Sequence, residues 1–117
     1  MTGVSIDSRS IEPGDLFVAV GGGVDFVTDA LEAGAAAALI PEDAFGALGA
    51  LGRTVRERSN AKVVAVTGST AKTSTKEAAA AVLGVARRTL RTEGNQNNEI
   101  GLPLTLLRLG PEHEAAV

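Results

Sequence analysis

The stretch that most constrains the fold of this chain is an apolar run followed at once by a small-residue turn and a lysine–threonine pair. It reads Val-Val-Ala-Val-Thr-Gly-Ser-Thr-Ala-Lys-Thr over residues 63–73. The apolar run is typical of a buried strand, and the segment after the pair is typical of a helix. A turn of this kind directs backbone N–H groups and the positive end of the helix dipole at one spot, beside Lys72 and Thr73. The pattern therefore predicts a site for nucleotide phosphates.

The match to the general phosphate-loop template is incomplete. That template asks for glycine six residues and one residue before the lysine. Val66 and Ala71 hold these two positions, and the shorter pattern that survives joins Gly68 to Lys72 and Thr73. An alternative interpretation is a strand, a turn and a surface lysine on an ordinary helix. The strand before the turn and the helix after it favour the phosphate site.

Composition sets the outer limits on fold and function. A chain of 117 residues has room for one ordinary domain or two very small ones, and its hydrophobic share of 44% supports a folded protein. The net charge of -3 disfavours a nucleic-acid partner. The chain has no cysteine, so thiolate metal sites and disulfides are excluded and a cytoplasmic location is expected. No apolar run is long enough to cross a bilayer, so no membrane partner is expected.

The order of patterned segments predicts an α/β architecture with a mostly parallel sheet in the second half, because strand patterns alternate with helix patterns. Expected strands cover residues 4–7, 16–20, 36–40, 63–66, 89–92 and 114–117, and expected helices cover 25–33, 41–58, 71–88 and 102–109.

Two of the expected helices carry specific predictions. The helix over 41–58 contains Gly46, Gly49 and Gly52, each of which costs about 1 kcal/mol relative to alanine. Either close backbone packing offsets this cost, or the helix is frayed. The helix over 71–88 is predicted from Ala79, Val82, Leu83 and Ala86, which recur at helical spacing.

Three motifs resemble the Mur ligases, a family that builds the peptidoglycan precursor. Residues 7–19 resemble the opening of these enzymes, and residues 67–77 resemble their ATP loop. Residues 93–104 look like a segment typical of the branch that adds D-alanyl-D-alanine. The resemblance implies a small amino-terminal α/β domain over residues 1–60 that binds a UDP-linked substrate. It implies that residues 61–117 begin a P-loop-type ATP domain with a mostly parallel sheet.

The resemblance also implies a reaction. Ligases of this branch use ATP and Mg²⁺ to join D-alanyl-D-alanine to a UDP-N-acetylmuramoyl-tripeptide through an acyl phosphate. By resemblance, Lys72 is the catalytic residue that neutralises phosphate charge, and Thr73 holds Mg²⁺ through its hydroxyl. The implied ATP-phosphate set is Gly68, Ser69, Thr70, Ala71, Lys72, Thr73 and Ser74.

Four further residues match substrate-facing positions of the family. Ser8 and Arg9 match the motif near the UDP end of the substrate, although Arg9 has an alternative role as an ion-pair partner of Asp7 or Asp15. Asn97 and Asn98 match the loop that faces the substrate. Without the resemblance, these two asparagines are ordinary turn residues.

The chain also departs from the family pattern. Ala71 stands where these ligases have glycine, and a positive φ there adds strain of about 1–2 kcal/mol. A substrate-loop histidine is absent from residues 22–26, and His113 is expected to be a solvated surface residue rather than a substitute.

The family's later metal ligands and its closing domain are not found. We therefore expect a truncated chain that does not catalyse ligation alone. The alternatives are a non-catalytic nucleotide-binding module and a structural half-domain that self-associates through an unfinished sheet edge.

Overall fold

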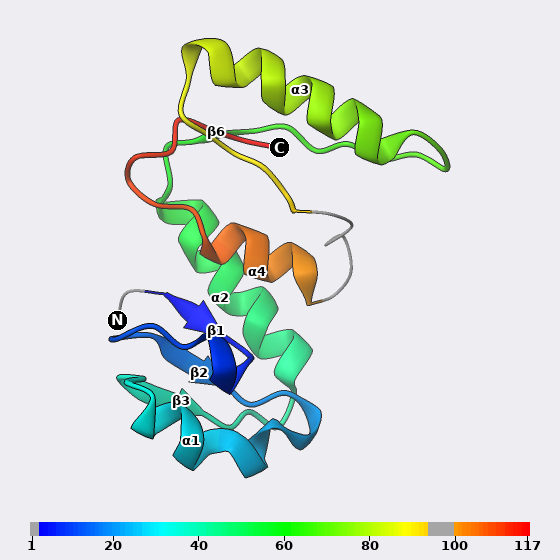
Figure 1. Cartoon of the computed structure of the whole chain (residues 1–117). Coiled ribbons are helices and arrows are strands. Elements are labelled where there is room, and N and C mark those ends of the chain that lie inside the picture. The colour runs from blue at the N-terminus through cyan, green and yellow to red at the C-terminus, as the bar shows by residue number, and fades with distance from the viewer. Residues whose placement is uncertain (1–2, 94–99) are drawn as a thin grey trace. The chain divides into compact units, whose positions relative to one another are not determined.

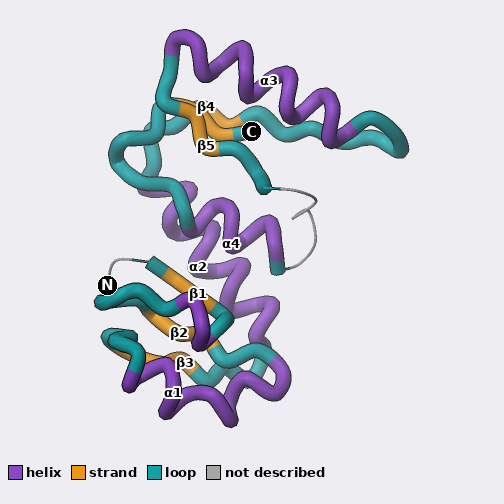
Figure 2. The backbone as a smooth tube through the Cα atoms, in the orientation of Figure 1, coloured by secondary structure: helices purple, strands orange, loops and turns teal. Residues whose placement is uncertain are grey.

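The computed structural model describes residues 3–93 and 100–117. The chain forms two compact units, Met1–Leu51 and Gly52–Val117, and each contains a three-stranded parallel sheet (Figures 1 and 2). The division falls within a single helix, α2 (Ala44–Arg58). The assignment of a substrate domain to residues 1–60 and an ATP domain to residues 61–117 stays a prediction.

The first unit is built on strands β1 (Val4–Ser5), β2 (Leu16–Val18) and β3 (Ala37–Leu39), which pair in parallel in that order. A one-turn 3-10 helix, Ser8–Ser10, follows β1. A second 3-10 segment, Gly21–Phe26, leads into α1 (Val27–Glu32). These elements enclose a small core, since the chain has only three phenylalanines and no larger aromatic. Its buried members are Phe17, Ala19 and Ala30, and Ile11, Val27, Ala35 and Ala38 pack around them.

The second unit contains strands β4 (Lys62–Val63), β5 (Thr89–Leu90) and β6 (Ala115–Ala116) and helices α3 (Lys72–Ala86) and α4 (Gly101–Leu107). The strand order is β4-β6-β5, and both pairings are parallel. Helix α3 lies on one side of this sheet and α4 on the other, as Figure 2 shows. The expected parallel α/β architecture is therefore confirmed. The core consists of Ala61, Leu90, Leu109 and Ala116, with Val55 and Leu106 packed against it.

Helix α2 is continuous through its three glycines. Its first turn is capped by Asp43, whose Oδ1 accepts the Gly46 N–H at 3.0 Å. Gly52 is the glycine that allows close packing, because a Cβ placed there would lie 3.2 Å from the Cα of Pro103. A Cβ on Gly49 would meet nothing within 4 Å. Close backbone packing therefore accounts for Gly52, whereas a Cβ on Gly46 would meet the carboxylate of Asp43, and the frayed-helix alternative is wrong.

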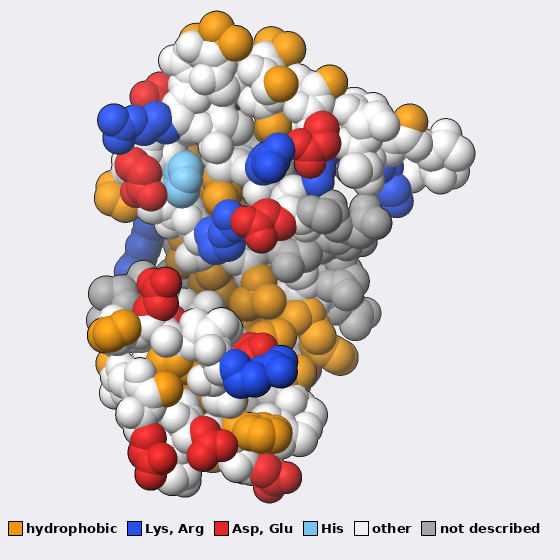
Figure 3. Space-filling view, in the orientation of Figure 1, with side chains coloured by type: hydrophobic (Ala, Val, Ile, Leu, Met, Phe, Trp, Pro, Cys, Tyr) orange, Lys and Arg blue, Asp and Glu red, His pale blue; other side chains and the backbone are white. Residues whose placement is uncertain are grey.

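Burial differs from the apolar pattern of the sequence at two places. The run before the phosphate loop was expected to be buried, yet only Lys62–Val63 forms strand and both Val63 and Val64 are exposed. In α3 the residues that become buried are Lys76 and Ala80, whereas Val82 is 73% exposed. Hydrophobic side chains accordingly lie on the surface over α3 (Figure 3). The helix is rich in alanine, so its apolar periodicity was too weak to indicate which face is inward.

The different surroundings of Gly49 and Gly52 in α2 can be compared with a matched pair of variants. Gly49→Ala should raise the free energy of unfolding by about 1 kcal/mol, because it gains helix propensity without meeting a neighbour. Gly52→Ala makes the same gain but presses a methyl group on the Pro103 backbone. We expect it to be clearly less stable than Gly49→Ala in urea denaturation. Equal stability of the two variants would contradict the close approach.

Candidate functional site

The turn between β4 and α3 has the backbone geometry of an anion cradle. Gly68 has φ of 151° and Ala71 has φ of 59° and ψ of 18°, the left-handed conformation. Helix α3 begins at the next residue, and no side chain caps its first turn. The leading N–H groups of a helix have no partner within the helix, and the helix dipole makes their surroundings positive. The condition under which alanine adds strain, a positive φ at residue 71, is therefore met in the structure.

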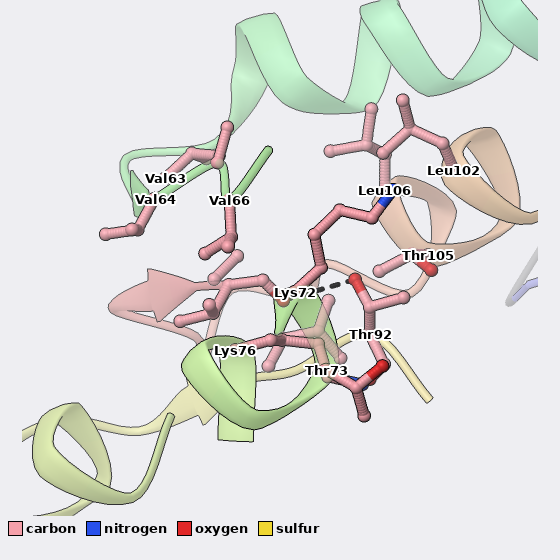
Figure 4. A pocket seen from close by; sticks show the side chains of 14 residues that line it. Val63, Val64, Val66, Lys72, Thr73, Lys76, Thr92, Leu102, Thr105 and Leu106 are labelled. Atoms are coloured by element: carbon pink, nitrogen blue, oxygen red, sulfur yellow. Dashed lines mark hydrogen bonds between the residues drawn. The ribbon is translucent and has the colours of Figure 1, made fainter. Parts of the chain in front are cut away.

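A pocket of about 270 Å³ lies beside this turn, at the carboxyl ends of the three strands (Figure 4). Crevices at this edge of a parallel sheet are the usual ligand sites of α/β proteins. Aliphatic side chains form most of the wall, and the polar groups come from Lys72, Thr73, Lys76, Thr92 and Thr105. The aliphatic lining comes from Val63, Val64, Ala65, Val66, Leu90, Leu102, Leu106, Ala116 and Val117.

Lys72 is the cation best placed to meet an anion at this turn. Its side chain is exposed, and its ammonium group has no hydrogen-bond or ion-pair partner within the part of the chain that the structure describes. It is the first residue of α3, so its charge adds to the positive end of the helix dipole. Of the other predicted phosphate ligands, Ser69, Thr70, Thr73 and Ser74 are exposed along the turn and the first turn of α3.

A second lysine, Lys76, lines the same pocket, and the sequence interpretation did not single it out. Its side chain is buried, and its Nζ donates a hydrogen bond of 2.6 Å to the Thr92 carbonyl. Nζ also lies 3.2 Å from Glu77 Oε1, and this contact lowers the pKa of Glu77 together with the Arg91 charge. The sequence feature that could have indicated a role for Lys76 is the lysine–glutamate pair that ends the 67–77 motif.

The predicted substrate residues Ser8 and Arg9 lie in the first unit, on the 3-10 turn that Asp7 caps. Arg9 Nε and Nη2 each donate to an Asp7 carboxylate oxygen at 3.0 Å. This two-bond pair lowers the pKa of Asp7. The alternative role of Arg9 as an ion-pair partner is thus confirmed with Asp7. Asp15 is buried instead and accepts the Glu12 N–H at 3.0 Å.

The structure describes His113, but not the two predicted substrate residues Asn97 and Asn98. His113 was expected to be solvated, but its side chain is only 17% exposed. Its Nδ1 accepts the Gly110 N–H at 2.9 Å, so it holds the turn before β6. Asn97 and Asn98 lie outside the described residues. Over residues 3–93 and 100–117, no group of three or more acidic, histidine or cysteine side chains is arranged to hold a metal ion.

The helices that the structure describes are too short or too polar to cross a membrane.

Comparison with known proteins agrees with the fold. Residues 66–117 match the Mur ligase middle domain. The UDP-N-acetylmuramoyl-tripeptide–D-alanyl-D-alanine ligase of Escherichia coli is 44% identical over 130 residues, which cover 97% of this chain. The corresponding ligase of Bacillus subtilis is 38% identical over 134 residues, which cover 98% of this chain. Nearly the whole chain is therefore similar in sequence to Mur ligases, and its second half matches their middle domain.

Solved structures identify the branch. A crystal structure of MurF from Acinetobacter baumannii superposes with a TM-score of 0.85 at 39% identity and covers 97% of this chain. MurF from Thermotoga maritima, solved in complex with ADP, gives a TM-score of 0.81 at 34% identity over 97% of this chain. The predicted relationship to MurF is confirmed. The chain spans about 29% of the length of the Escherichia coli and Acinetobacter baumannii proteins that it matches.

The left-handed alanine leads to a prediction with an internal control. Ala71→Gly should raise the free energy of unfolding by about 1 kcal/mol, because glycine adopts this φ without strain. Ala78→Gly, at an exposed position within α3, should lower it by about 1 kcal/mol. Urea denaturation of both variants gives the comparison. A loss of stability in both would show that residue 71 is not left-handed.

Proposed function

We propose that this chain supplies the ATP-phosphate loop and part of the substrate site of a MurF-type ligase. The observation that carries the proposal is Lys72 at the start of α3, directly after the left-handed turn at Ala71, exposed and without an ion-pair or hydrogen-bond partner among residues 3–93 and 100–117. The ADP complex of the Thermotoga maritima relative supports a nucleotide as the ligand. The cytoplasmic location expected from the absence of cysteine stays a prediction.

The residues present fit a nucleotide phosphate and its Mg²⁺. No side chain caps the start of α3, so the first N–H groups of the helix would be free to bind phosphate oxygens, together with backbone N–H groups of residues 69–72. Lys72 would neutralise charge on the β- and γ-phosphates, as the P-loop lysine does. Thr73 would contribute its hydroxyl to Mg²⁺, and the ion's other ligands would be phosphate oxygens and water. In this scheme the loop positions the phosphates and stabilises developing charge.

The reaction that this loop would serve is the joining of D-alanyl-D-alanine to a UDP-N-acetylmuramoyl-tripeptide. The γ-phosphoryl group of ATP passes to the terminal carboxylate of the tripeptide, and ADP leaves. The amine of the dipeptide then attacks the acyl phosphate, so that a peptide bond forms and phosphate is released. Ser8 and Arg9 would contact the UDP end, and Asn97 and Asn98 would face the substrate.

The phosphate role of Lys72 can be tested by titration calorimetry. The chain should bind ATP with Mg²⁺ more tightly than it binds adenosine, since only ATP engages the cradle. Lys72→Met should remove most of that difference, a loss of about tenfold or more in ATP affinity, because a charged hydrogen-bond donor contributes about 1.5–3 kcal/mol. Adenosine affinity should not change.

Lys62→Met provides the matched control, because Lys62 is also an exposed lysine but does not line the pocket. It should bind ATP as the parent does. If Lys62→Met and Lys72→Met weaken ATP equally, the effect is one of net charge and the cradle is not the site. If the parent itself binds ATP no better than adenosine, the proposal is wrong for this chain.

The role of Arg9 has its own test, with UDP as the probe. Arg9→Ala should weaken UDP binding about tenfold, because one charge-assisted contact to the diphosphate is lost. Arg53→Ala, which removes an exposed arginine from α2, should have no effect. Unchanged UDP affinity in Arg9→Ala would restrict Arg9 to its pair with Asp7.

A further inference from the structure

The two lysines of α3 that line the pocket have different surroundings. Lys72 and Lys76 are four residues apart, so they lie on the same side of the helix, about one turn from each other. Lys72 is exposed, whereas Lys76 is only 7% exposed. Burying an ammonium group is costly unless strong acceptors surround it. The burial of Lys76 therefore has to be explained by what its ammonium contacts.

The contact that compensates this burial is the Thr92 backbone carbonyl. The Nζ–O distance of 2.6 Å is short for a charge-assisted hydrogen bond, and it joins residues 16 positions apart in the sequence. Thr92 follows β5, and its own N–H donates to the Val117 carbonyl at 2.9 Å. The Thr92 hydroxyl donates to the same carbonyl at 3.2 Å. Thr92 thus connects α3 through Lys76 to the end of β6.

A second contact holds the same two segments together beside the first. Glu77, the next residue of α3, pairs through Oε2 with Arg91 Nη1, and through Oε1 with Lys76 Nζ. Glu77 and Arg91 are exposed, so the ion pair between them adds little free energy by itself. They do restrict the side chain of Lys76 to the direction of Thr92. The segment after β5 is therefore attached to α3 at two consecutive residues.

We propose that Lys76 is a positioning residue, whose hydrogen bond to Thr92 sets the distance between the phosphate loop and the opposite wall of the pocket. Because α3 is a rigid helix, fixing its second turn also fixes its first residue, Lys72. One lysine binds the phosphates and the other holds the first in place. This inference rests on the proposed function, since it assigns the nucleotide to the cradle beside Lys72.

The test compares ATP and ADP binding to the parent chain, Lys76→Met and Lys72→Met. A positioning role predicts that Lys76→Met weakens both nucleotides by the same factor, about tenfold, because both need the cradle in place. Lys72→Met should weaken ATP more than ADP, since ATP carries the additional phosphate. Lys76→Arg keeps a charged donor and should recover much of the affinity lost in Lys76→Met.

Hydrogen exchange of the unliganded chain gives a readout independent of nucleotide. Lys76→Met should raise the exchange rates of the Thr92 and Val117 amides, which belong to the network that Lys76 anchors. The amide of Phe17, in the core of the first unit, should exchange as in the parent. Unchanged rates at Thr92 and Val117 would show that Lys76 does not hold this segment, and would overturn the proposal.

The binding outcomes separate the proposal from its rivals. A selective loss of ATP over ADP in Lys76→Met would show that Lys76 contacts phosphate itself. A lower melting temperature with unchanged nucleotide affinity would show a merely structural lysine. Either result overturns the positioning role. If the parent chain binds neither nucleotide, the proposed function fails, and the exchange rates still decide whether Lys76 holds Thr92.

Discussion

The arrangement of the second unit depends on one short strand, β6, which is hydrogen-bonded on both sides. The Val64 N–H donates to the Ala116 carbonyl at 2.8 Å on one side, and the Val117 N–H donates to Leu90 at 2.9 Å on the other. Because both pairings are parallel, the carboxyl ends of all three strands point the same way. The turn that starts α3 and the segment after β5 therefore reach the same edge of the sheet. The pocket and its two lysines are a consequence of this pairing.

The phosphate turn combines a strained residue with a charged one. A non-glycine residue in the left-handed region is uncommon, and it persists only where its surroundings require that conformation. Here the requirement comes from the chain reversal between β4 and α3, which also places Lys72 at the positive end of the helix. The strained residue directly precedes Lys72, so a change at Ala71 would act both on stability and on the proposed phosphate site.

Much of the fold was predictable from the sequence because its signals are local. Alternating strand and helix patterns predicted the parallel α/β architecture, and the residues around Gly68 and Ala71 predicted the turn between β4 and α3. Which segment lines the pocket opposite α3 was not predictable, because the contact between Lys76 and Thr92 joins residues 16 positions apart in the sequence. No composition rule indicates that a lysine on an alanine-rich helix becomes buried. The pairing of Arg9 with Asp7 was one of two alternatives, and only the structure distinguished Asp7 from Asp15.

The central claim is that the turn over residues 68–74 holds the phosphates of a nucleotide. Amide chemical shifts of the ¹⁵N-labelled chain, followed while ATP and Mg²⁺ are added, test it most directly. The account predicts that the largest shifts occur at residues 68–74, with smaller ones at Thr92 and Val117 and none in the core around Phe17. Large shifts elsewhere, with the 68–74 amides unmoved, would contradict it.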